Sequence, residues 1–414
     1  MKTKILLLFL AIFQLGFSQE RTCGTDEKMA ELMFNPLRRQ QFEQTQLLFE
    51  AELERLQSGL AFEEMSTEPF RIPVAVHYVD VPENASASLK TCLINLAQNQ
   101  IDILNADYNG TNADISNWTD NASFFFPGVN TGSLSINLEL ATQNHPGGLG
   151  LVNGQVAVTF GYDFGFGSDF DSTWAGYLNI VVTELGTTLG YAYLGSNPSN
   201  GVTIVMDNNA FGSVGNGCAG YMPGAPYNLG RTLTHELGHY LNLRHIWGDG
   251  FCGNDFVEDT PQHNTSNGGC PELGHTSLCT GNPIELTMNY MDYTNDACMY
   301  MFTEGQTQRQ LAHFNVIKNN FNQTTLSSGS FEKNYEVTLF PNPSKGLITL
   351  SFGDYTSGVS YQVIDFSGRV ILNHTINESS VISHDIDLRN AAKGVYIISV
   401  KTDNGTVNRK VIID

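Results

Sequence analysis

Basic side chains are scarce in this 414-residue chain, which has 21 Lys and Arg against 42 Asp and Glu and a formal net charge of −21. Nucleic acids and anionic membranes attract proteins through basic patches. The shortage therefore excludes nucleic acid as an expected partner and makes an anionic membrane surface a poor one. The surplus of acids fits a solvated surface, or carboxylates that bind calcium.

Long hydrophobic runs are also lacking. The opening stretch, MKTKILLLFLAIFQLGFSQE, has two lysines, then an apolar run and the small residue Ser18. A transmembrane helix needs about 20 apolar residues, and this run is too short for one. The pattern is typical of a secretory signal peptide over residues 1–18. We therefore expect a secreted protein, extracellular or at the cell surface, with no transmembrane segment.

Cysteine is sparse and odd in number, with seven residues in the chain. An exported protein meets an oxidising environment in which disulfides form. Four cysteines crowd into residues 252–298, and their connectivity is open at this point. Cys92 and Cys218 either pair with each other or stay free, which leaves Cys23.

Histidine is concentrated instead, because three of the ten histidines fall in HELGHYLNLRH, residues 235–245. A helix places His235 and His239 on one face, one turn apart, where a single zinc ion can bind both imidazoles. Glu236 lies beside them and can act as a general base on a water at that metal. Chance occurrence of HExxH on an ordinary amphipathic helix is the alternative.

The third histidine makes chance a weaker explanation. His245 comes six residues after His239, which is well off the shared helical face. It can join the other two only if the helix ends and the chain folds back. Asn242 is the expected helix stop, because Asn tolerates left-handed backbone and often ends helices.

HELGHYLNLRH resembles the extended zinc signature of the metzincin metalloproteases, with Asn242 where their glycine is usual. TMNYMDYTNDACMYMFTEGQ, residues 287–306, resembles the same family's Met-turn, of which Met291 is the methionine. DFVEDTPQ at 255–262, NYMDYTNDAC and FTEGQ are together similar to the pappalysin branch of secreted proteases. The resemblance covers residues 66–326.

This resemblance implies a metzincin-like zincin catalytic domain of the α/β (α+β) class, with a loop-rich lower subdomain. Zinc is expected on His235, His239 and His245, with Glu236 as general base. Tyr293, two residues after the Met-turn methionine, is expected to support the oxyanion, or else to be a core aromatic. The implied disulfides are the crossed pairs Cys252–Cys279 and Cys270–Cys298.

Two further sites rest on the same resemblance. Asp296 is expected to line the pocket for the residue just after the scissile bond, which would favour Arg or Lys there. An Asp in a surface turn is the alternative. Calcium is expected in the acidic loop, where plain solvated acids are the alternative; the candidates are Asp249, Asp255, Glu258, Asp259 and Thr260.

Residues 19–65 read as a charged helical segment that Pro36 splits, without a strand pattern. Such a segment before a secreted protease is typical of a pro-segment. Cys23 lies in it, and a thiolate is a good zinc ligand. Cys23 is therefore expected to hold the enzyme latent, as in the cysteine switch of some metzincins, or else to be an unpaired thiol.

Hydrophobic periodicity predicts the elements of the catalytic domain, residues 66–326. Alternation predicts strands at 72–78 and at 135–140, and apolar runs predict buried strands at 176–182 and 201–206. A helical face spans 93–108, and the zinc helix is expected at about 229–241. The strand at 135–140 is the candidate edge strand that binds substrate as an added strand.

The composition changes after residue 326. A linker is expected over 327–335, and short alternating strands over 336–414 predict an all-β, Ig-like sandwich. FPNPSKG, DFSGR and the GVYIISV…GTVNRKVII ending resemble the C-terminal sorting domain of type IX secretion, which implies the type IX secretion machinery as a partner. A generic binding module is the alternative.

These observations predict a secreted zinc endopeptidase, made as a latent zymogen, that acts on protein or peptide substrates. The main alternative is a catalytically silent metzincin-like module that binds a surface ligand. Intact Glu236 favours the enzyme, because a binding module has no use for a general base. A disulfide-rich adhesin would not explain MNYMD where a Met-turn belongs.

Overall fold

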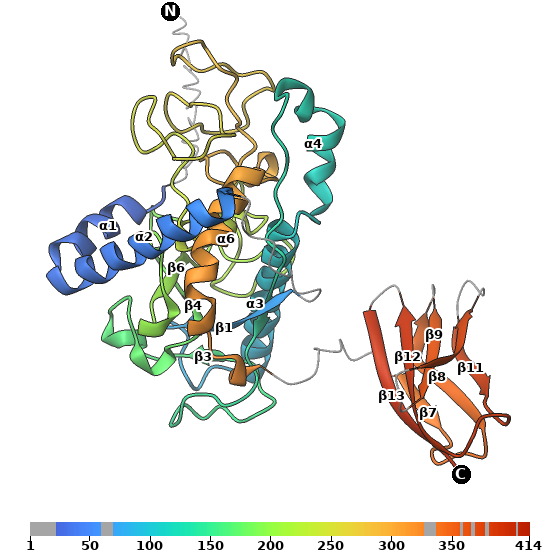
Figure 1. Cartoon of the computed structure of the whole chain (residues 1–414). Coiled ribbons are helices and arrows are strands. Elements are labelled where there is room, and N and C mark those ends of the chain that lie inside the picture. The colour runs from blue at the N-terminus through green and yellow to red at the C-terminus, as the bar shows by residue number, and fades with distance from the viewer. Residues whose placement is uncertain are drawn as a thin grey trace, which may run out of the picture. The chain divides into compact units, whose positions relative to one another are not determined.

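The computed structural model describes residues 22–58, 69–326, 337–356, 359–365, 369–376, 381–402 and 405–414. The chain forms two compact units, residues 1–326 and 327–414, which Figure 1 draws. The expected signal peptide and the expected linker lie outside the described residues. No helix in the described ranges is both long enough and apolar enough to cross a membrane.

A six-stranded sheet is the frame of the first unit. All neighbouring strands are parallel except β5, which runs antiparallel to β6. The four strands predicted from periodicity are confirmed as β1, β2, β4 and β6. The strand order across the sheet is β2 (Ile136–Leu140), β1 (Phe70–Tyr78), β4 (Leu178–Thr183), β6 (Thr203–Asp207) and β5 (Gly190–Tyr191), and β3 (Val158–Phe160) also pairs with β1.

Six α-helices accompany this sheet in the described part of the unit. The break predicted at Pro36 is confirmed, because one helix ends at Phe34 and the next begins at Pro36. The helices are α1 (Thr25–Phe34), α2 (Pro36–Gln57), α3 (Ala87–Tyr108), α4 (Ser116–Asp120), α5 (Arg231–Tyr240) and α6 (Glu304–Ile317).

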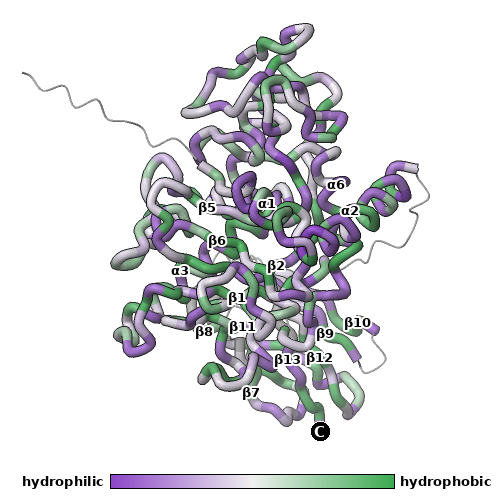
Figure 2. The backbone as a smooth tube through the Cα atoms, turned by 90° about the vertical axis from the view of Figure 1, so that its left-hand side faces the viewer, coloured by the Kyte–Doolittle hydropathy of each residue, from purple (hydrophilic) through white to green (hydrophobic). Residues whose placement is uncertain are grey.

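The sheet is buried on both faces, because successive strand residues point to opposite sides. Val74 and Ile180 face a core that includes Leu93 of α3 and Leu237 of α5. Their neighbours on the other side, such as Val181, pack around Trp174. Figure 2 shows hydrophobic stretches along strands such as β6, whereas the segment between α5 and α6 alternates in short stretches. Helix α5, which contains the HExxH motif, therefore packs against the face of the sheet that includes Val74 and Ile180.

The segment between α5 and α6, residues 241–303, is irregular. All of it is described, and apart from isolated bridges it holds only the 3-10 turn Asp296–Cys298. Two disulfides cross-link it, Cys252–Cys279 and Cys270–Cys298, which are the pairs that the resemblance implied. A third bond joins Cys92 to Cys218, so that Cys23 is the one free cysteine.

The second unit is all β. Its two antiparallel sheets share one hydrophobic core, to which Leu350, Val363 and Ile398 belong, so the predicted sandwich is confirmed. One sheet has the order β11 (Val381–Asp387), β8 (Leu347–Thr356) and β7 (Val337–Phe340), and the other has the order β10 (Val370–Thr375), β9 (Ser360–Asp365), β12 (Gly394–Thr402) and β13 (Gly405–Ile413).

Candidate metal centre and active site

Helix α5 ends where the sequence predicted. Asn242 follows its last turn with a φ of 71°, in the left-handed region. The N–H of Leu243 donates to the carbonyl of Gly238 (2.9 Å), and that of Asn242 donates to the carbonyl of His239 (2.9 Å). This pair of bonds is the usual way in which a left-handed residue closes a helix. The chain folds back here and returns His245 to the other two histidines.

The three histidines converge on one point. The Nε2 atom of His239 lies 3.1 Å from Nε2 of His235 and 3.1 Å from Nε2 of His245. Nitrogens bound tetrahedrally to one zinc are about 3.3 Å apart. All three side chains are buried. The residues present therefore fit one zinc ion, and zinc is the metal that such a set of imidazoles would hold.

Hydrogen bonds at the far side of the rings set the tautomers. Nδ1–H of His235 donates to the carbonyl of Tyr290 (2.7 Å), and Nδ1–H of His239 donates to the carbonyl of Leu243 (2.8 Å). Each Nε2 is then left with its lone pair toward the shared point. Burial, with a contribution from nearby His245, lowers the pKa of His239 to about 3, which keeps the imidazole neutral as a metal ligand must be.

Asp249 holds the third histidine. Nδ1–H of His245 donates to the carboxylate of Asp249, and the ring of His245 stacks on Trp247 with centroids 4.3 Å apart. The sequence predicted Asp249 as a calcium candidate. In the structure its carboxylate accepts from one of the three converging imidazoles, because a local turn, in which the N–H of Gly248 donates to the carbonyl of His245 (2.8 Å), brings the two side chains together.

Met291 lies directly under the zinc-motif helix, as a Met-turn implies. A side chain at Gly238 would place its Cβ 2.5 Å from the sulfur of Met291, so only glycine leaves room. The turn is held by the N–H of Met291, which donates to Oδ1 of Asn289 (2.9 Å). The preceding carbonyl, that of Tyr290, is the one that accepts from His235. The turn thus supports a metal ligand through its backbone.

Glu236 and Tyr293 flank the three histidines. Glu236 is buried, and its Oε2 lies 3.4 Å from Sγ of Cys23. The Tyr293 hydroxyl accepts from the backbone N–H of Cys23 (3.3 Å), and its ring lies 5.0 Å from that of His245. Burial, followed by the nearby Cys23 and Glu236, raises the pKa of Tyr293 above its usual value. The phenol therefore stays protonated and can donate.

Cys23 enters this centre from the segment before the catalytic sheet. Its Sγ and one nitrogen of each of His235, His239 and His245 all lie within 4.8 Å of one another. The hydroxyl of Thr25 lies 3.1 Å from the same sulfur. A sulfur and three imidazoles form a complete tetrahedral ligand set for zinc.

Cys23 pairs with β5, whereas the strand predicted to bind substrate is β2. The N–H of Gly24 donates to the carbonyl of Gly190, and the N–H of Leu189 donates to the carbonyl of Thr22, both at 3.0 Å. A Cβ at Gly190 would lie 3.1 Å from Cγ of Glu236, which puts this strand at the active site. Strand β2 is at the opposite edge of the sheet. The edge strand beside Glu236 is therefore β5, which the sequence did not reveal because a two-residue strand shows no alternation.

Asp296 is fully buried at the beginning of α5. Its Oδ2 accepts from the N–H groups of Leu229 (2.8 Å) and Arg231 (3.3 Å). A carboxylate at a helix N-terminus satisfies otherwise unpaired N–H groups and favours the helix dipole. Asp296 is therefore not the surface turn residue of the alternative reading.

The remaining acids of the expected calcium loop lie apart. Asp255 accepts from the hydroxyl of Thr260 (2.9 Å), and Asp259 accepts from the hydroxyl of Thr303 and the N–H of Gly305. Glu258 is exposed and lines a surface hollow together with Asp259 and Thr260. In the ranges that the structure describes, the groups of three or more His, Cys, Asp or Glu that converge both contain His245.

Two family models match the chain. One, described as Pregnancy-associated plasma protein-A, matches residues 177–315, and the other, described as Secretion system C-terminal sorting domain, matches residues 338–414. Extracellular metalloprotease 1 of Coccidioides posadasii is 41% identical over 134 residues, 32% of this chain and 47% of that protein. A Neurospora crassa extracellular metalloprotease is 34% identical over 34% of this chain and 48% of its own length. The chain spans about half the length of the curated relatives it matches.

Solved structures give longer matches. Mirolysin in complex with compound 9 is 34% identical, with a TM-score of 0.51 over 63% of this chain and 98% of that chain. A Tannerella forsythia promirolysin mutant is 30% identical, with a TM-score of 0.54 over 74% and 95%. With the sorting domain and the extracellular relatives, these matches describe a secreted or cell-surface protein. The chain belongs to the pappalysin family of metzincin metalloproteases and carries a C-terminal type IX secretion sorting domain.

Proposed function

We propose that the chain is the latent precursor of a secreted zinc endopeptidase that cuts protein or peptide substrates. The observation that carries this proposal is the convergence of three buried imidazoles, in which Nε2 of His239 lies 3.1 Å from Nε2 of each of the other two, beside a buried glutamate. Three histidines with a fourth position for another ligand are the usual set of a catalytic zinc site.

Each group at this site has a chemical task. Zinc, when bound, supplies a Lewis acid that polarises a carbonyl and makes a water molecule more acidic. Glu236 takes the proton of that water and passes it to the leaving amine nitrogen. Tyr293, which burial keeps protonated, donates a hydrogen bond to the carbonyl oxygen as negative charge develops there.

The edge of β5, which residues 22–24 cover in the precursor, orients the substrate. The N–H of Leu189 and the carbonyl of Gly190 bond to backbone groups of Thr22 and Gly24 in the precursor. An extended peptide can use the same two groups once the pro-segment has left, as a strand added to the sheet. Backbone bonds of this kind give affinity without selecting a side chain.

Substitution of the proposed general base, Glu236, tests whether the chain is an enzyme. Glu236→Ala should lower turnover about 10²- to 10⁴-fold while zinc content, measured by metal analysis of the full chain, stays at that of the wild type. Cleavage by the wild type should stop with a zinc chelator and return with added zinc. A zinc-loaded, folded wild type that cuts no peptide in a proteome-derived mixture would leave the silent binding module as the function.

Latency is proposed to come from Cys23, because its sulfur lies within 4.8 Å of the three imidazole nitrogens. A sulfur at that place takes the position that a catalytic water needs. Cys23→Ala should therefore speed cleavage by the precursor or its self-processing, and Cys23→Ser should give a smaller increase. An unchanged precursor in both variants would remove Cys23 from latency.

We propose that Asp296 produces a preference for Arg or Lys just after the scissile bond. Its buried carboxylate lies at the start of α5, where it also accepts two backbone hydrogen bonds. Asp296→Asn keeps an acceptor for the helix but removes the charge. Cleavage before Arg and Lys should fall relative to cleavage before Leu, as a peptide-mixture profile would show. If the profile is unchanged while the thermal midpoint falls, Asp296 acts only on the helix.

Two further assignments stay proposals. Calcium is proposed for the loop of Asp255 and Asp259, whose carboxylates are partly or fully enclosed. The type IX secretion machinery is proposed as the partner of residues 338–414. A chain that ends at residue 326 should then remain inside the outer membrane of a type IX secreting host, and its recovery in the medium at wild-type levels would contradict that partner.

A further inference from the structure

Two cationic side chains of the proposed pro-segment lie on one small surface of residues 69–326, here called the catalytic unit. Nζ of Lys28, from α1, lies 3.3 Å from Oδ2 of Asp169 and 4.9 Å from the ring centroid of Tyr191. Lys28 also approaches Glu31 of its own helix at 3.2 Å. The contact with Asp169 therefore joins the pro-segment to the catalytic unit, and the contact with Glu31 does not.

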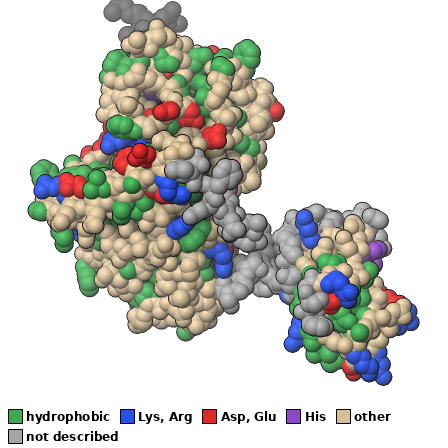
Figure 3. Space-filling view, in the orientation of Figure 1, with side chains coloured by type: hydrophobic (Ala, Val, Ile, Leu, Met, Phe, Trp, Pro, Cys, Tyr) green, Lys and Arg blue, Asp and Glu red, His purple; other side chains and the backbone are tan. Residues whose placement is uncertain are grey.

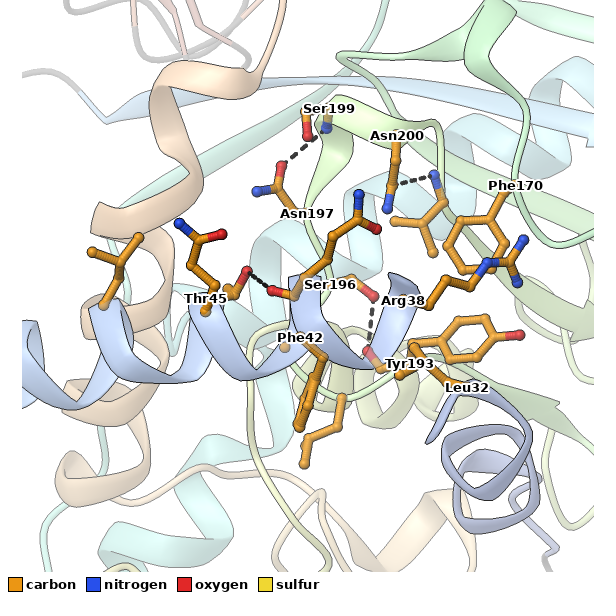
Figure 4. Close-up of a pocket in the computed structure, with 16 residues that line it drawn as sticks. Leu32, Arg38, Phe42, Thr45, Phe170, Tyr193, Ser196, Asn197, Ser199 and Asn200 are labelled. Carbon is orange, nitrogen blue, oxygen red and sulfur yellow. Dashed lines mark hydrogen bonds between the residues drawn. The ribbon is translucent and has the colours of Figure 1, made fainter. Parts of the chain in front are cut away.

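The second cation is Arg38 of α2. Its guanidinium carbon lies 3.7 Å from the ring centroid of Phe170, and the ring of Tyr193 lies 5.2 Å from that of Phe170. Figure 4 shows Arg38 extending from its helix to Phe170, with Tyr193 beside it, at one end of a cavity of about 280 Å³. The faces of aromatic rings attract cations of this kind.

Hydrogen bonds to β5, β6 and Tyr193 hold Asp169, the residue that pairs with Lys28. Oδ1 of Asp169 accepts from the Tyr191 hydroxyl and Oδ2 accepts from the Tyr193 hydroxyl, both at 2.8 Å. The carbonyl of Asp169 accepts from the N–H of Thr203 in β6 (3.0 Å). Burial, then the charge of Asp169, raises the pKa of both tyrosines above its usual value, so both remain hydrogen-bond donors. The carboxylate is thus held in place whether or not a lysine is present.

We propose that Asp169, Phe170, Tyr191 and Tyr193 form a second subsite, here called the acidic–aromatic platform, which binds a Lys or Arg side chain of a polypeptide substrate after the pro-segment leaves. This inference rests on the proposed protease function. Tyr191 directly follows Gly190, whose carbonyl accepts from the N–H of Gly24, the residue after Cys23. A peptide lying along β5 therefore passes the platform, and Lys28 and Arg38 occupy its place in the precursor.

The platform is distinct from the pocket proposed for Asp296. Asp296 bonds to the first turn of α5. The platform instead includes Tyr191, the last residue of β5, and Phe170, which forms a bridge to Val202. It should therefore select a basic residue at a position other than the one just after the scissile bond. A partly exposed charge pair with a cation–π contact corresponds to a preference of roughly three- to tenfold.

Paired peptides test this selection on the protein matured from the full chain. Each pair differs only by Lys or its neutral analogue norleucine, placed in turn at four positions before the scissile bond and at the second to fourth after it. The wild type should prefer Lys three- to tenfold in kcat/KM at one of these positions. Asp169→Asn should abolish that preference and keep the preference just after the bond. Asp163→Asn, which removes a charge from an exposed side chain of the preceding segment, is the control and should behave as the wild type.

A second measurement does not depend on turnover. In the full precursor the rate at which a thiol reagent modifies Cys23 reports how often the pro-segment opens. Lys28→Gln and Asp169→Asn should each raise that rate about threefold or more, and the double variant should add little to either single one. Independent, multiplying effects would mean that the platform does not bind the cation and would overturn the proposal.

The outcomes separate the two hypotheses. A wild type that cleaves without preferring Lys at any of the seven positions overturns the subsite and leaves the protease standing. A wild type that cleaves nothing overturns the protease. The Cys23 modification rates then decide whether the platform binds a cationic side chain, and rates that are unchanged in both single variants would overturn the subsite as well.

Discussion

The catalytic unit and the pro-segment lie against each other but are stabilised differently. Every residue of α5 is buried. By contrast, the 32 residues of α1 and α2 bury only Thr25, Leu32, Phe49 and Leu53. Charged side chains of both signs gather over these two helices in Figure 3. Burial of apolar surface is the main source of stability, so the two regions should separate without unfolding the sheet.

Several of the contacts that join the two regions are polar. Gln46 exchanges two hydrogen bonds with Asn242, and Asn315 donates to Glu52 (2.8 Å). Hydrogen bonds and half-exposed ion pairs each contribute little net free energy. We therefore expect docking of the proposed pro-segment to depend on a few anchors and on Cys23.

The largest effect is expected at the main apolar anchor. Phe49 is fully buried against Leu53 and Ala312, with the guanidinium of Arg309 4.7 Å from its ring centroid. Phe49→Ala should weaken docking of α2 by about 3–5 kcal/mol and leave the unfolding of the catalytic unit unchanged.

Hydrogen exchange of the precursor checks this expectation, because residues 36–57 should lose protection while β4 and β6 keep theirs. Leu47→Ala is the control, since Leu47 lies on the same helix and is 73% exposed. Equal loss of protection in both regions would show that the pro-segment and the sheet form one cooperative unit.

The next effect concerns the irregular segment of the catalytic unit. Burial raises the pKa of Asp255 from 3.8 to about 6, so the folded protein keeps a proton that the unfolded chain loses near pH 4. The free energy of unfolding should therefore fall as the pH rises from 4 to 6, by about 3 kcal/mol from this group. Asp255→Asn should remove that fall.

Urea unfolding at several pH values, with a chelator and with calcium, measures the difference between the wild type and Asp255→Asn. Bound calcium would favour the charged carboxylate and should flatten the fall. Exposed Asp163→Asn should follow the wild type. A difference that does not depend on pH would show that burial does not raise this pKa, and a fall that calcium leaves unchanged would argue against calcium at Asp255.

A smaller effect is expected at the orienting carboxylate of the metal site. Asp249→Ala removes the acceptor of His245 Nδ1–H, and loss of such a partner typically weakens metal binding about 10- to 100-fold. Chelator competition on the full chain measures the zinc affinity. Arg244→Gln is a matched control, because Arg244 approaches the same carboxylate only at 3.9 Å. Equal zinc affinity in both variants would mean that Asp249 does not orient the ligand.

The smallest effect is expected at Asn242, where the two regions meet. Asn242→Ala places an ordinary side chain at a φ of 71° and should cost the catalytic unit about 1 kcal/mol. Asn242→Gly relieves the backbone and should affect only the pair with Gln46. Gln46→Ala should therefore match Asn242→Gly in opening of the pro-segment. If Asn242→Gly destabilises the catalytic unit as much as Asn242→Ala, its side chain rather than its backbone is what matters.

Features that depend on local geometry were predictable from the sequence. The histidine spacing requires a helix followed by a turn, and Asn242 is the residue that can make the turn. Alternating apolar residues likewise predicted β1 and β2, and the break at Pro36 predicted two helices. Each of these follows from residues within a few positions of one another.

Features that join distant residues were missed. No local pattern marks the two-residue strand β5, or the pairing of its Gly190 with the chain at Cys23. Asp169 became a partner of Lys28 only across 141 positions. Glycine at 190 was the one available signal, because an edge strand that passes close to Glu236 has no room for a side chain.

The sequence by itself determined the cluster of three histidines, the helix stop, the secreted character and the sandwich tail, because spacing, turn chemistry and composition act over short distances. The tertiary structure decided which strand edge lies at the metal centre, which acids orient a ligand or cap a helix, and where the cations of the pro-segment rest. These choices depend on how the sheet, α5 and the irregular segment pack together, and packing is set by contacts between residues that are far apart in the chain.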